Sequence, residues 1–290
     1  MLNRRNFLIG TGITTVGTLL GLDAFAGPLY KDKIGIQLYT LREDLPTIGL
    51  GNVFKKIAAA GYNSVEMFGF SSTDGFFKSS PKKVAALLKK YGLSSPSGHY
   101  MLDLFDNDGQ QTINAAKMPG HKYIVIPWFP PEQRSSLDDY RRIAERINKA
   151  AALCKKNNIK LAYHNHEFEF TKYEGSVSGF DILMKECGKN IDFELDLFWV
   201  DFAGENAIEL FKKYPGRFKM WHVKDRSKTN PQINTEVGSG SIDYKKIFAK
   251  AKLSGLEYFY VEQENFDMAS AQSIKKSNQY VREKLLKAGK

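Results

Sequence analysis

From Lys33 onward, short hydrophobic runs alternate with longer stretches in which hydrophobic residues recur every three or four positions. The short runs predict buried β-strands, and the longer stretches predict amphipathic α-helices. The expected strands are residues 34–39, 64–67, 93–98, 123–127, 161–164, 192–197, 218–223 and 258–262. The expected helices are residues 53–60, 81–91, 110–117, 137–157, 179–187, 207–214, 244–251 and 269–287.

Turn and cap residues support these boundaries. Pro81 suits the first turn of a helix, and Gly61, Gly92, Gly188 and Gly255 fall where helices should end. Strands that alternate with helices indicate right-handed βαβ units and a parallel sheet. Eight such units match an α/β fold of the (β/α)8 TIM barrel type, which typically needs about 250 residues.

An open, doubly wound sheet is the structural alternative. A dinucleotide-binding version of that fold needs a glycine-rich turn after its first strand. Here the turn reads Thr-Leu-Arg-Glu over residues 40–43, so the barrel is favoured. No linker or repeat divides the chain, and we expect a single barrel domain over residues 27–290.

The first 26 residues predict an export signal rather than part of the fold. Arg4 and Arg5 precede a moderately apolar run over residues 7–22, and Ala24 and Ala26 supply the small residues that a signal peptidase requires. This start resembles a twin-arginine signal cleaved after Ala26, which implies a periplasmic protein. The run is too short and too rich in Gly and Thr for a comfortable membrane span, although an uncleaved anchor is the alternative.

The net charge of +10 raises the question of a nucleic-acid partner. The lysines, however, occur as separated pairs on the expected helices, such as Lys55 with Lys56 and Lys155 with Lys156, which is typical of solvated helix faces. We therefore expect no nucleic-acid partner. Aromatic residues make up 13% of the chain, which fits either a large core or a pocket whose rings stack on a sugar.

Metal-seeking side chains gather at the ends of the last four expected strands. In a TIM barrel the carboxyl ends of the strands form the active-site face, so these ends lie around one mouth. A lone histidine there is usually structural, and a lone carboxylate usually caps a loop. Several buried ionisable groups together are costly unless they are paired, which favours a cation. The residues are His164, His166 and Glu169 at the fifth strand, Glu194 and Asp196 on the sixth, His222 on the seventh and Glu262 on the eighth.

The same segments carry a resemblance to a known family. They are GIQLYTLRED (35–44), SVEMFG (64–69), SGHY (97–100), YHNHEFEF (163–170), ELDLFW (194–199), HVKD (222–225), GSGSID (238–243) and VEQEN (261–265). In this order they resemble the xylose-isomerase-like TIM-barrel superfamily, in its sugar phosphate isomerase/epimerase branch. The resemblance covers essentially all of residues 33–287 and implies a metal-dependent enzyme that acts on a sugar.

The resemblance also implies a ligand set. In that family one divalent cation is held by Glu, Asp, His and Glu from strands five to eight. Asp196, His222 and Glu262 match three of these positions. The family's fifth-strand Glu falls on His164, so the implied set has two histidines and two carboxylates, unless Glu169 reaches in from the following loop. Such ligands accept Mn, Co, Zn or Mg.

Family isomerases and epimerases use two metal-bound carboxylates, on opposite faces of the sugar, to move a proton beside a carbonyl. The resemblance makes Glu262 one acid/base group and leaves His164, His166 or Glu169 to supply the other. We expect a divalent-metal-dependent isomerase or epimerase acting on a sugar or keto-sugar. Because one carboxylate is replaced, a metal-dependent lyase or dehydratase acting on a keto-polyol or 3-keto-glycoside is the alternative. A non-catalytic sugar-binding barrel is the second alternative.

Five further residues near the same mouth are candidates for substrate binding: Glu66, His99, Trp128, Trp199 and Lys224. Each also has a structural explanation, because Lys224 can pair with Glu66 or Asp225 and the tryptophans can simply pack. Residues 238–240 stand where barrels often bind phosphate, although a Gly-Ser-Gly stretch is more often a turn. The expected partner is an unphosphorylated sugar or polyol, and a homo-oligomer stays open.

Overall fold

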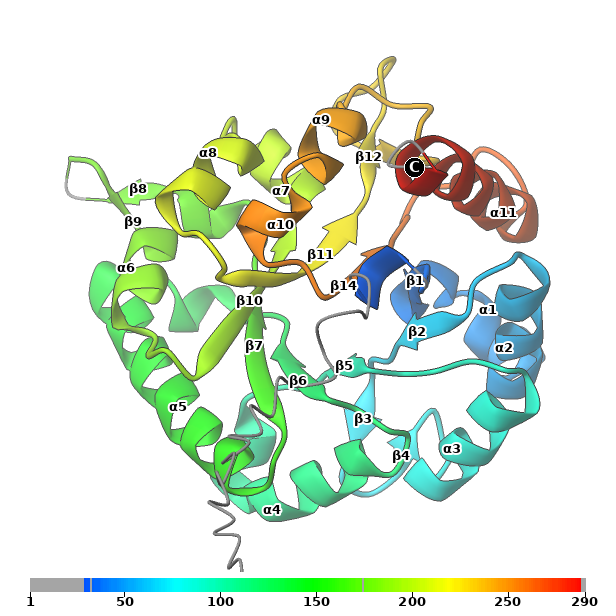
Figure 1. Cartoon of the computed structure of the whole chain (residues 1–290). Coiled ribbons are helices and arrows are strands. Elements are labelled where there is room, and N and C mark those ends of the chain that lie inside the picture. Colours follow the sequence, from blue (N-terminus) through cyan, green and yellow to red (C-terminus); the bar gives the residue numbers. More distant parts are fainter. Residues whose placement is uncertain (1–28, 32, 174, 288–290) are drawn as a thin grey trace, which may run out of the picture.

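The fold is a barrel of parallel strands surrounded by helices (Figure 1). The computed structural model describes residues 29–31, 33–173 and 175–287. The eight barrel strands pair in the order β2-β1-β14-β11-β10-β7-β6-β5. Each coincides with an expected strand, so the predicted α/β TIM barrel is confirmed. Their bounds are β1 (Gly35–Gln37), β2 (Ser64–Glu66), β5 (Ser97–His99), β6 (Tyr123–Ile126), β7 (Lys160–His164), β10 (Ile191–Asp196), β11 (Phe218–Val223) and β14 (Tyr258–Val261).

The barrel closes loosely between β2 and β5. Isolated bridges join Ser64 to Ser94 and Met67 to Gly98 in place of a continuous ladder. The amide of His99 donates to the carbonyl of Met67 over 2.7 Å. Because both outer strands are partly paired in this way, the sheet leaves no long open edge.

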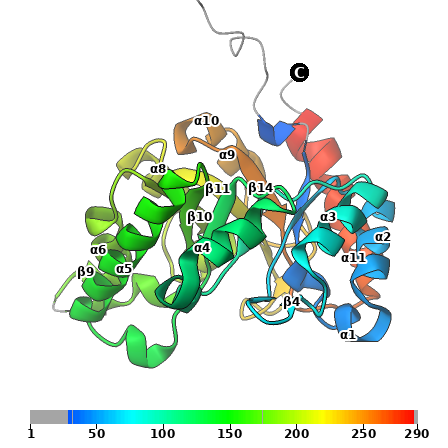
Figure 2. The ribbon, with the colours of Figure 1, turned by 90° about the horizontal axis from the view of Figure 1, so that it is seen from below.

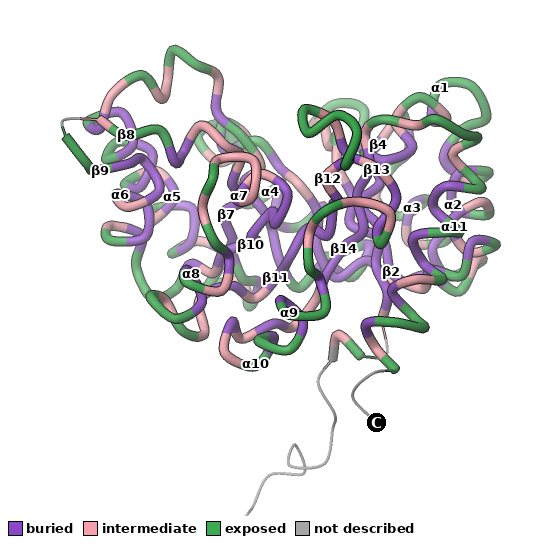
Figure 3. Tube along the Cα trace, turned by 90° about the horizontal axis from the view of Figure 1, so that it is seen from above, coloured by how far each residue is buried: buried purple, intermediate pink, exposed green. Residues whose placement is uncertain are grey.

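Helices cover the outside of the barrel, and Figure 3 shows buried strands in the middle of the molecule with exposed outer turns of the helices on either side. Local signals start several of them: Ser136 caps α5 by accepting from the amide of Asp139, and Ser178 and Asp181 form a capping box on α6. The helices are α1 (Asp44–Ile48), α2 (Leu50–Ala59), α3 (Pro81–Lys90), α4 (Asp103–Lys117), α5 (Leu137–Lys156), α6 (Gly179–Glu186), α7 (Leu197–Phe202), α8 (Ala207–Lys213), α9 (Tyr244–Phe248), α10 (Ala251–Ser254) and α11 (Ser270–Tyr280), with a π-helical turn over Val281–Leu286.

Helix α7 differs from the sequence expectation. The hydrophobic run of the sixth strand continues into it, so the sequence predicts strand up to residue 197 and no helix between residues 197 and 207. In the structure the strand ends at Asp196, whose Oδ1 accepts from the amides of Phe198 over 2.9 Å and Trp199 over 3.1 Å. A buried carboxylate thus ends β10 and starts α7 at the same residue.

The interior of the barrel is layered. An apolar layer consists of Tyr123, Val125, Ala162, Met220 and Tyr260, all buried. Gly35 faces the same space, where a Cβ would lie 2.4 Å from the Tyr260 ring, so glycine makes room for that ring. Because side chains alternate along a strand, the residue two positions further on each strand faces the interior one layer nearer the mouth. On three strands these next positions are ionisable: His164 follows Ala162, His222 follows Met220 and Glu262 follows Tyr260.

Three antiparallel hairpins extend the loops that follow barrel strands. Figure 2 shows the β3–β4 hairpin and α1 at one end of the barrel and α10 at the opposite end. The hairpin end is the mouth, because these segments follow the carboxyl ends of the strands. The hairpins pair β3 (Phe70–Ser71) with β4 (Gly75–Phe76), β8 (Lys172–Tyr173) with β9 (Val177–Ser178), and β12 (Asp225–Arg226) with β13 (Asn234–Thr235).

The expected export signal, residues 1–26, lies outside the described residues and stays a prediction. Within residues 29–31, 33–173 and 175–287, no helix is long and apolar enough to cross a membrane.

Candidate metal centre

Seven ionisable side chains from six strands converge inside the mouth of the barrel. All occupy the inward face of their strand, and all except His99 are buried. They are Glu66 from β2, His99 from β5, His164 from β7, Glu194 and Asp196 from β10, His222 from β11 and Glu262 directly after β14.

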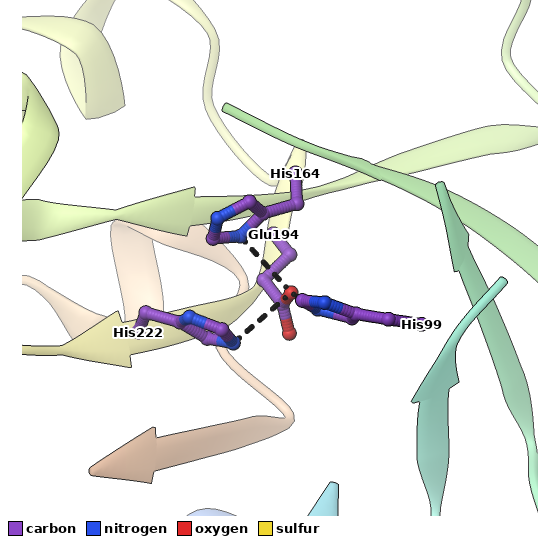
Figure 4. Close-up of side chains that lie close together, drawn as sticks. All are labelled: His99, His164, Glu194 and His222. Carbon is purple, nitrogen blue, oxygen red and sulfur yellow. Dashed lines mark hydrogen bonds and ion pairs between the residues drawn. The ribbon is translucent and has the colours of Figure 1, made fainter. Parts of the chain in front are cut away.

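Glu194 is the centre of the deeper part of this group. Figure 4 shows His99, His164 and His222 arranged around its carboxylate. Its Oε2 lies 2.9 Å from His99 Nε2, 3.2 Å from His164 Nδ1 and 3.2 Å from His222 Nε2. Burial opposes ionisation of this carboxyl, but the neighbouring imidazoles outweigh burial and hold its pKa well below the ordinary value. Glu194 was among the metal-seeking residues at the strand ends, but the ligand set that the resemblance implies did not include it.

His222 connects two groups of donor atoms. Its Nε2 faces Glu66, 2.7 Å from Oε2, while its Nδ1 lies 2.6 Å from Glu262 Oε2 and 3.8 Å from Asp196 Oδ2. Within each group the donor atoms lie within 4.8 Å of one another, close enough to share one ion. We call them the inner set (His99, His164, Glu194 and His222) and the outer set (Asp196, His222 and Glu262).

The ammonium of Lys224 lies beside the outer set. Its Nζ is 3.3 Å from Asp196 Oδ2, 3.3 Å from Glu262 Oε2 and 2.7 Å from Glu264 Oε1. Burial disfavours the charge, but these carboxylates outweigh it and raise the pKa of Lys224 above its ordinary value. The sequence suggested Glu66 or Asp225 as the partner of Lys224; the structure places Glu264 there instead, together with the outer set.

The two carboxyls of the outer set have opposite electrostatic tendencies. Burial raises the pKa of Asp196 to about 6 despite Lys224 and His222 nearby. For Glu262, burial acts in the same direction, but Lys224 and His222 outweigh it and hold the pKa well below its ordinary value. Within the protein alone, therefore, Asp196 is the carboxylate whose charge is less well compensated.

The outer set fits a divalent cation. Asp196 Oδ2 is buried and makes no hydrogen bond among the described residues; the Lys224 ammonium forms an ion pair with it over 3.3 Å, and His164 Nε2 lies 3.9 Å away. A buried acceptor that makes no hydrogen bond costs up to about 1–3 kcal/mol, and a bound divalent ion would offset the part of that cost that the Lys224 ion pair leaves. Imidazole and carboxylate donors at the observed spacing suit Zn, Mn, Co or Mg to differing degrees. Asp196, His222 and Glu262 are the residues that would hold it, with His164 beside them.

Glu169, the alternative fifth ligand position, lies away from both sets. Its Oε1 accepts from the Tyr163 hydroxyl over 2.5 Å, and its Oε2 accepts from the His166 amide over 2.7 Å. Tyr163 occupies the outward face of β7, so Glu169 is buried behind the strand rather than in the mouth. Burial raises its pKa to about 8 against these hydrogen bonds.

Residues 238–242 form a turn whose backbone amides already donate hydrogen bonds to a side chain. Asp225 Oδ2 accepts from the amides of Gly238 over 2.8 Å and Gly240 over 3.1 Å, while Oδ1 accepts from the amide of Ile242 over 3.1 Å. These amides would be the donors of a phosphate site. The Gly-Ser-Gly stretch is therefore a turn held by a carboxylate.

A cavity of about 510 Å³ opens above the metal-seeking residues. Four of the five expected substrate-binding residues line it: His99, Trp128, Trp199 and Lys224. Glu66 does not line it and instead accepts hydrogen bonds from Gln37 Nε2 over 2.8 Å and Ser97 Oγ over 2.5 Å. His166 also lines the cavity, and its ring stacks on Phe168. The lining residues are Gln37, Tyr39, Phe68, Gly69, Phe70, His99, Met101, Pro127, Trp128, His164, His166, Trp199, Lys224, Glu262 and Glu264.

The family follows from a match over most of the chain. Residues 54–284 match the family model described as xylose isomerase-like TIM barrel. The chain belongs to the xylose isomerase-like TIM barrel family.

Three relatives within or near the family illustrate its range. An inosose dehydratase of Clostridium perfringens (strain 13 / Type A) is 28% identical over 296 residues, covering 87% of this chain and 97% of that protein. A sugar phosphate isomerase/epimerase from Parabacteroides distasonis has a solved structure with a TM-score of 0.77 and 26% identity, covering 91% and 96% of the two chains. The IolI protein, solved with a bound zinc atom, shares the fold with a TM-score of 0.68 and 15% identity over 87% and 99%.

Proposed function

We propose that this family member is a divalent-metal-dependent lyase that removes water from a keto-polyol or keto-sugar. The observation that carries the proposal is His164, an imidazole that points toward Asp196 where the family isomerases have a second carboxylate. Proton transfer on both faces of a sugar needs two bases, whereas an elimination can proceed with one. The 28% identity to an inosose dehydratase supports the same reaction class.

His164, Asp196, His222 and Glu262 would hold the cation. When bound, such an ion acts as a Lewis acid that polarises a ketone and stabilises charge on its oxygen. An ion of the kind found with IolI fits the same donor types. The identity of the ion is part of the test below.

His166 is the base in this proposal. It lines the cavity, lies outside both donor sets, and its buried Nδ1 has no hydrogen-bond partner among the described residues. Burial is the main cause that lowers the pKa of His166 well below its ordinary value, so the resting ring is neutral and one of its nitrogens carries a lone pair. His166 takes the proton from the carbon beside the ketone and returns it to the departing hydroxyl, which leaves as water.

Lys224 holds the polar end of the substrate. Its ammonium lines the cavity and keeps its charge through three neighbouring carboxylates. The expected substrate is unphosphorylated, because the amides of residues 238–242 that would receive a phosphate already donate to Asp225.

The second candidate is an isomerase or epimerase. The observation that favours it is the 26% identical structure of a sugar phosphate isomerase/epimerase. In that case Glu262, which also lines the cavity, supplies one acid/base group and His166 the other.

One assay in deuterated water separates the two reactions. Metal-reconstituted protein is given a panel of keto-polyols and keto-sugars, and products are followed by mass spectrometry. Loss of one water per substrate supports the lyase. Deuterium incorporation without loss of water supports the isomerase or epimerase. Protein that folds but binds no divalent ion, or turnover unaffected by a chelator, contradicts both; H166Q should abolish elimination while leaving the bound metal in place.

A further inference from the structure

The wall of the cavity is divided into two chemically different halves. The loops after the first four barrel strands supply the apolar half, and the ends of the last four supply most of the ionisable groups. We call the apolar half the aromatic wall: Tyr39, Phe68, Phe70, Met101 and Trp128. The metal-seeking residues lie opposite the aromatic wall, and they can bind only the polar part of a substrate.

The aromatic wall is held in place by further rings. Phe68 contacts Tyr39 on one side and Phe77 on the other, with ring centroids 5.1 and 4.9 Å away. Phe70 contacts Tyr100 at 5.3 Å. Gly69, between them, has a φ of +71°, and a Cβ there would lie 2.9 Å from the Phe77 ring. Backbone and packing together therefore fix the orientation of these rings.

The aromatic wall contains several of the few large hydrophobic side chains that are exposed to solvent. Among the described residues, seven large hydrophobic side chains are exposed, and Tyr39, Met101 and Trp128 are three of them. All three line one cavity. Apolar groups that gather around a pocket instead of being scattered mark a binding surface.

The size of the cavity points the same way. At about 510 Å³ it falls within the roughly 300–1,000 Å³ range of sites that enclose drug-sized ligands. A single six-membered polyol ring is far smaller than such a ligand. A free keto-polyol beside His166 and Lys224 would leave the aromatic wall uncovered.

We propose that the aromatic wall binds an apolar, ring-sized group attached to the substrate, so that the substrate is a keto-sugar derivative carrying an aromatic aglycone. This inference rests on the proposed function for the sugar half of the cavity. The aglycone lies against Phe70 and Trp128, where ring faces stack and apolar area leaves water. Trp128, 37% exposed, loses most of that exposure on binding.

The test uses two unreactive glycosides, phenyl and methyl β-D-glucopyranoside, which lack a keto group. Their binding to the metal-loaded protein is measured by calorimetry. We expect the phenyl glycoside to bind at least tenfold more tightly than the methyl glycoside. W128A should reduce this preference to threefold or less. M118A is the matched control, because Met118 is an equally apolar exposed residue that follows α4 at the opposite end of the barrel, and it should keep the preference.

Equal binding of the two glycosides, or a preference that survives in both W128A and F70A with their circular dichroism unchanged, would overturn the inference. Because no reaction takes place, this result is independent of the deuterated-water assay. Elimination without a phenyl preference contradicts the aromatic wall alone, and a phenyl preference without elimination contradicts the proposed reaction alone.

Discussion

Asp196 uses its two carboxylate oxygens for different tasks. Oδ1 accepts from two amides at the start of α7, whereas Oδ2 faces the outer set, makes no hydrogen bond among the described residues and is paired only electrostatically with Lys224. The cap fixes the carboxylate, so the free oxygen is presented to an ion without loss of side-chain freedom on binding. One residue therefore joins the architecture of the barrel to its chemistry.

We predict that D196N loses the metal but keeps the fold. Asparagine retains an oxygen that can accept from the Phe198 and Trp199 amides, while it removes the charge that a divalent ion requires. Metal affinity should fall by more than the roughly 10–100-fold that loss of an outer hydrogen-bond partner costs. Inductively coupled plasma analysis and a thermal melt measure both effects. E169Q is the control, and comparable metal loss in E169Q would contradict the assignment of the ligands.

Glu169 predicts a pH dependence of stability. Its pKa is raised by burial from 4.5 to about 8, so between these values the folded state binds more protons than the unfolded state. The free energy of unfolding therefore falls as pH rises through this window. In E169Q the fall should be smaller, by an amount on the order of a few kcal/mol between pH 5 and pH 8. Urea unfolding of both proteins at the two pH values measures it; parallel curves would show that Glu169 does not titrate.

The sequence located some of these residues and not others for physical reasons. Asp196 and His222 stand at strand ends with an inward period of two, which any barrel places in the mouth. Glu169 follows β7 by a short turn, and no periodicity tells whether such a side chain bends inward or back behind the strand. Glu194 has the right parity, but a resemblance transfers only the positions that the family uses.

At the level of elements, His121 ties β5 to the segment entering β6. Its Nε2 lies 3.0 Å from Ser95 Oγ and its Nδ1 lies 3.0 Å from the Tyr100 hydroxyl. The ring is buried, and burial lowers the pKa of His121 from 6.5 to about 3. A neutral imidazole is therefore built into the junction.

This junction predicts acid sensitivity. As pH falls from 6.5 toward 3, the unfolded chain protonates His121 and the folded protein does not, so the free energy of unfolding decreases. H121Q keeps a donor and an acceptor but cannot titrate. We expect H121Q to be less stable than the parent protein at pH 7, with a smaller further loss at pH 5. Urea unfolding of both proteins at the two pH values measures this. A larger loss of stability between pH 7 and pH 5 in H121Q than in the parent protein would contradict this role.

Strands were easier to predict than helices in this chain. Each barrel strand is a short hydrophobic run bounded by polar turns, and eight of them in alternation with helices leave few other folds. Helix α7 was not predicted, because Leu197 and Phe198 prolong the hydrophobic run of β10. Only the cap at Asp196, a contact of one side chain with the amides that follow it, marks the change.

At the scale of the whole molecule, the barrel separates support from recognition. The frame follows from a repeated pattern that the sequence displays. The aromatic wall does not, because Tyr39, Phe70 and Trp128 lie on loops after three different strands, and their proximity depends on barrel closure. Aromatic composition alone could not distinguish such a wall from core.

The start of the chain predicts export of the whole protein. Substituting Arg4 and Arg5 together by Lys should keep the protein in the cytoplasm, because a twin-arginine signal depends on that pair. Cell fractionation of the tagged full chain in a bacterial host measures it. The R42K variant, on the mature barrel, is the control and should fractionate like the parent protein. Unchanged periplasmic recovery of the double variant would contradict the signal.

His222 has one more consequence, which concerns its ring proton. If Nδ1 held a cation, that nitrogen could not carry a proton, and a neutral ring would carry its proton on Nε2, which faces Glu66 and Glu194. Without the cation, Nδ1 can share a proton with Glu262. Metal binding would therefore change the protonation of the His222 ring. Glu66 and Glu194 lie next to Nε2, so their hydrogen bonds to the ring would change with it. The electrostatics of the deeper carboxylates would thus depend on whether the outer set holds an ion.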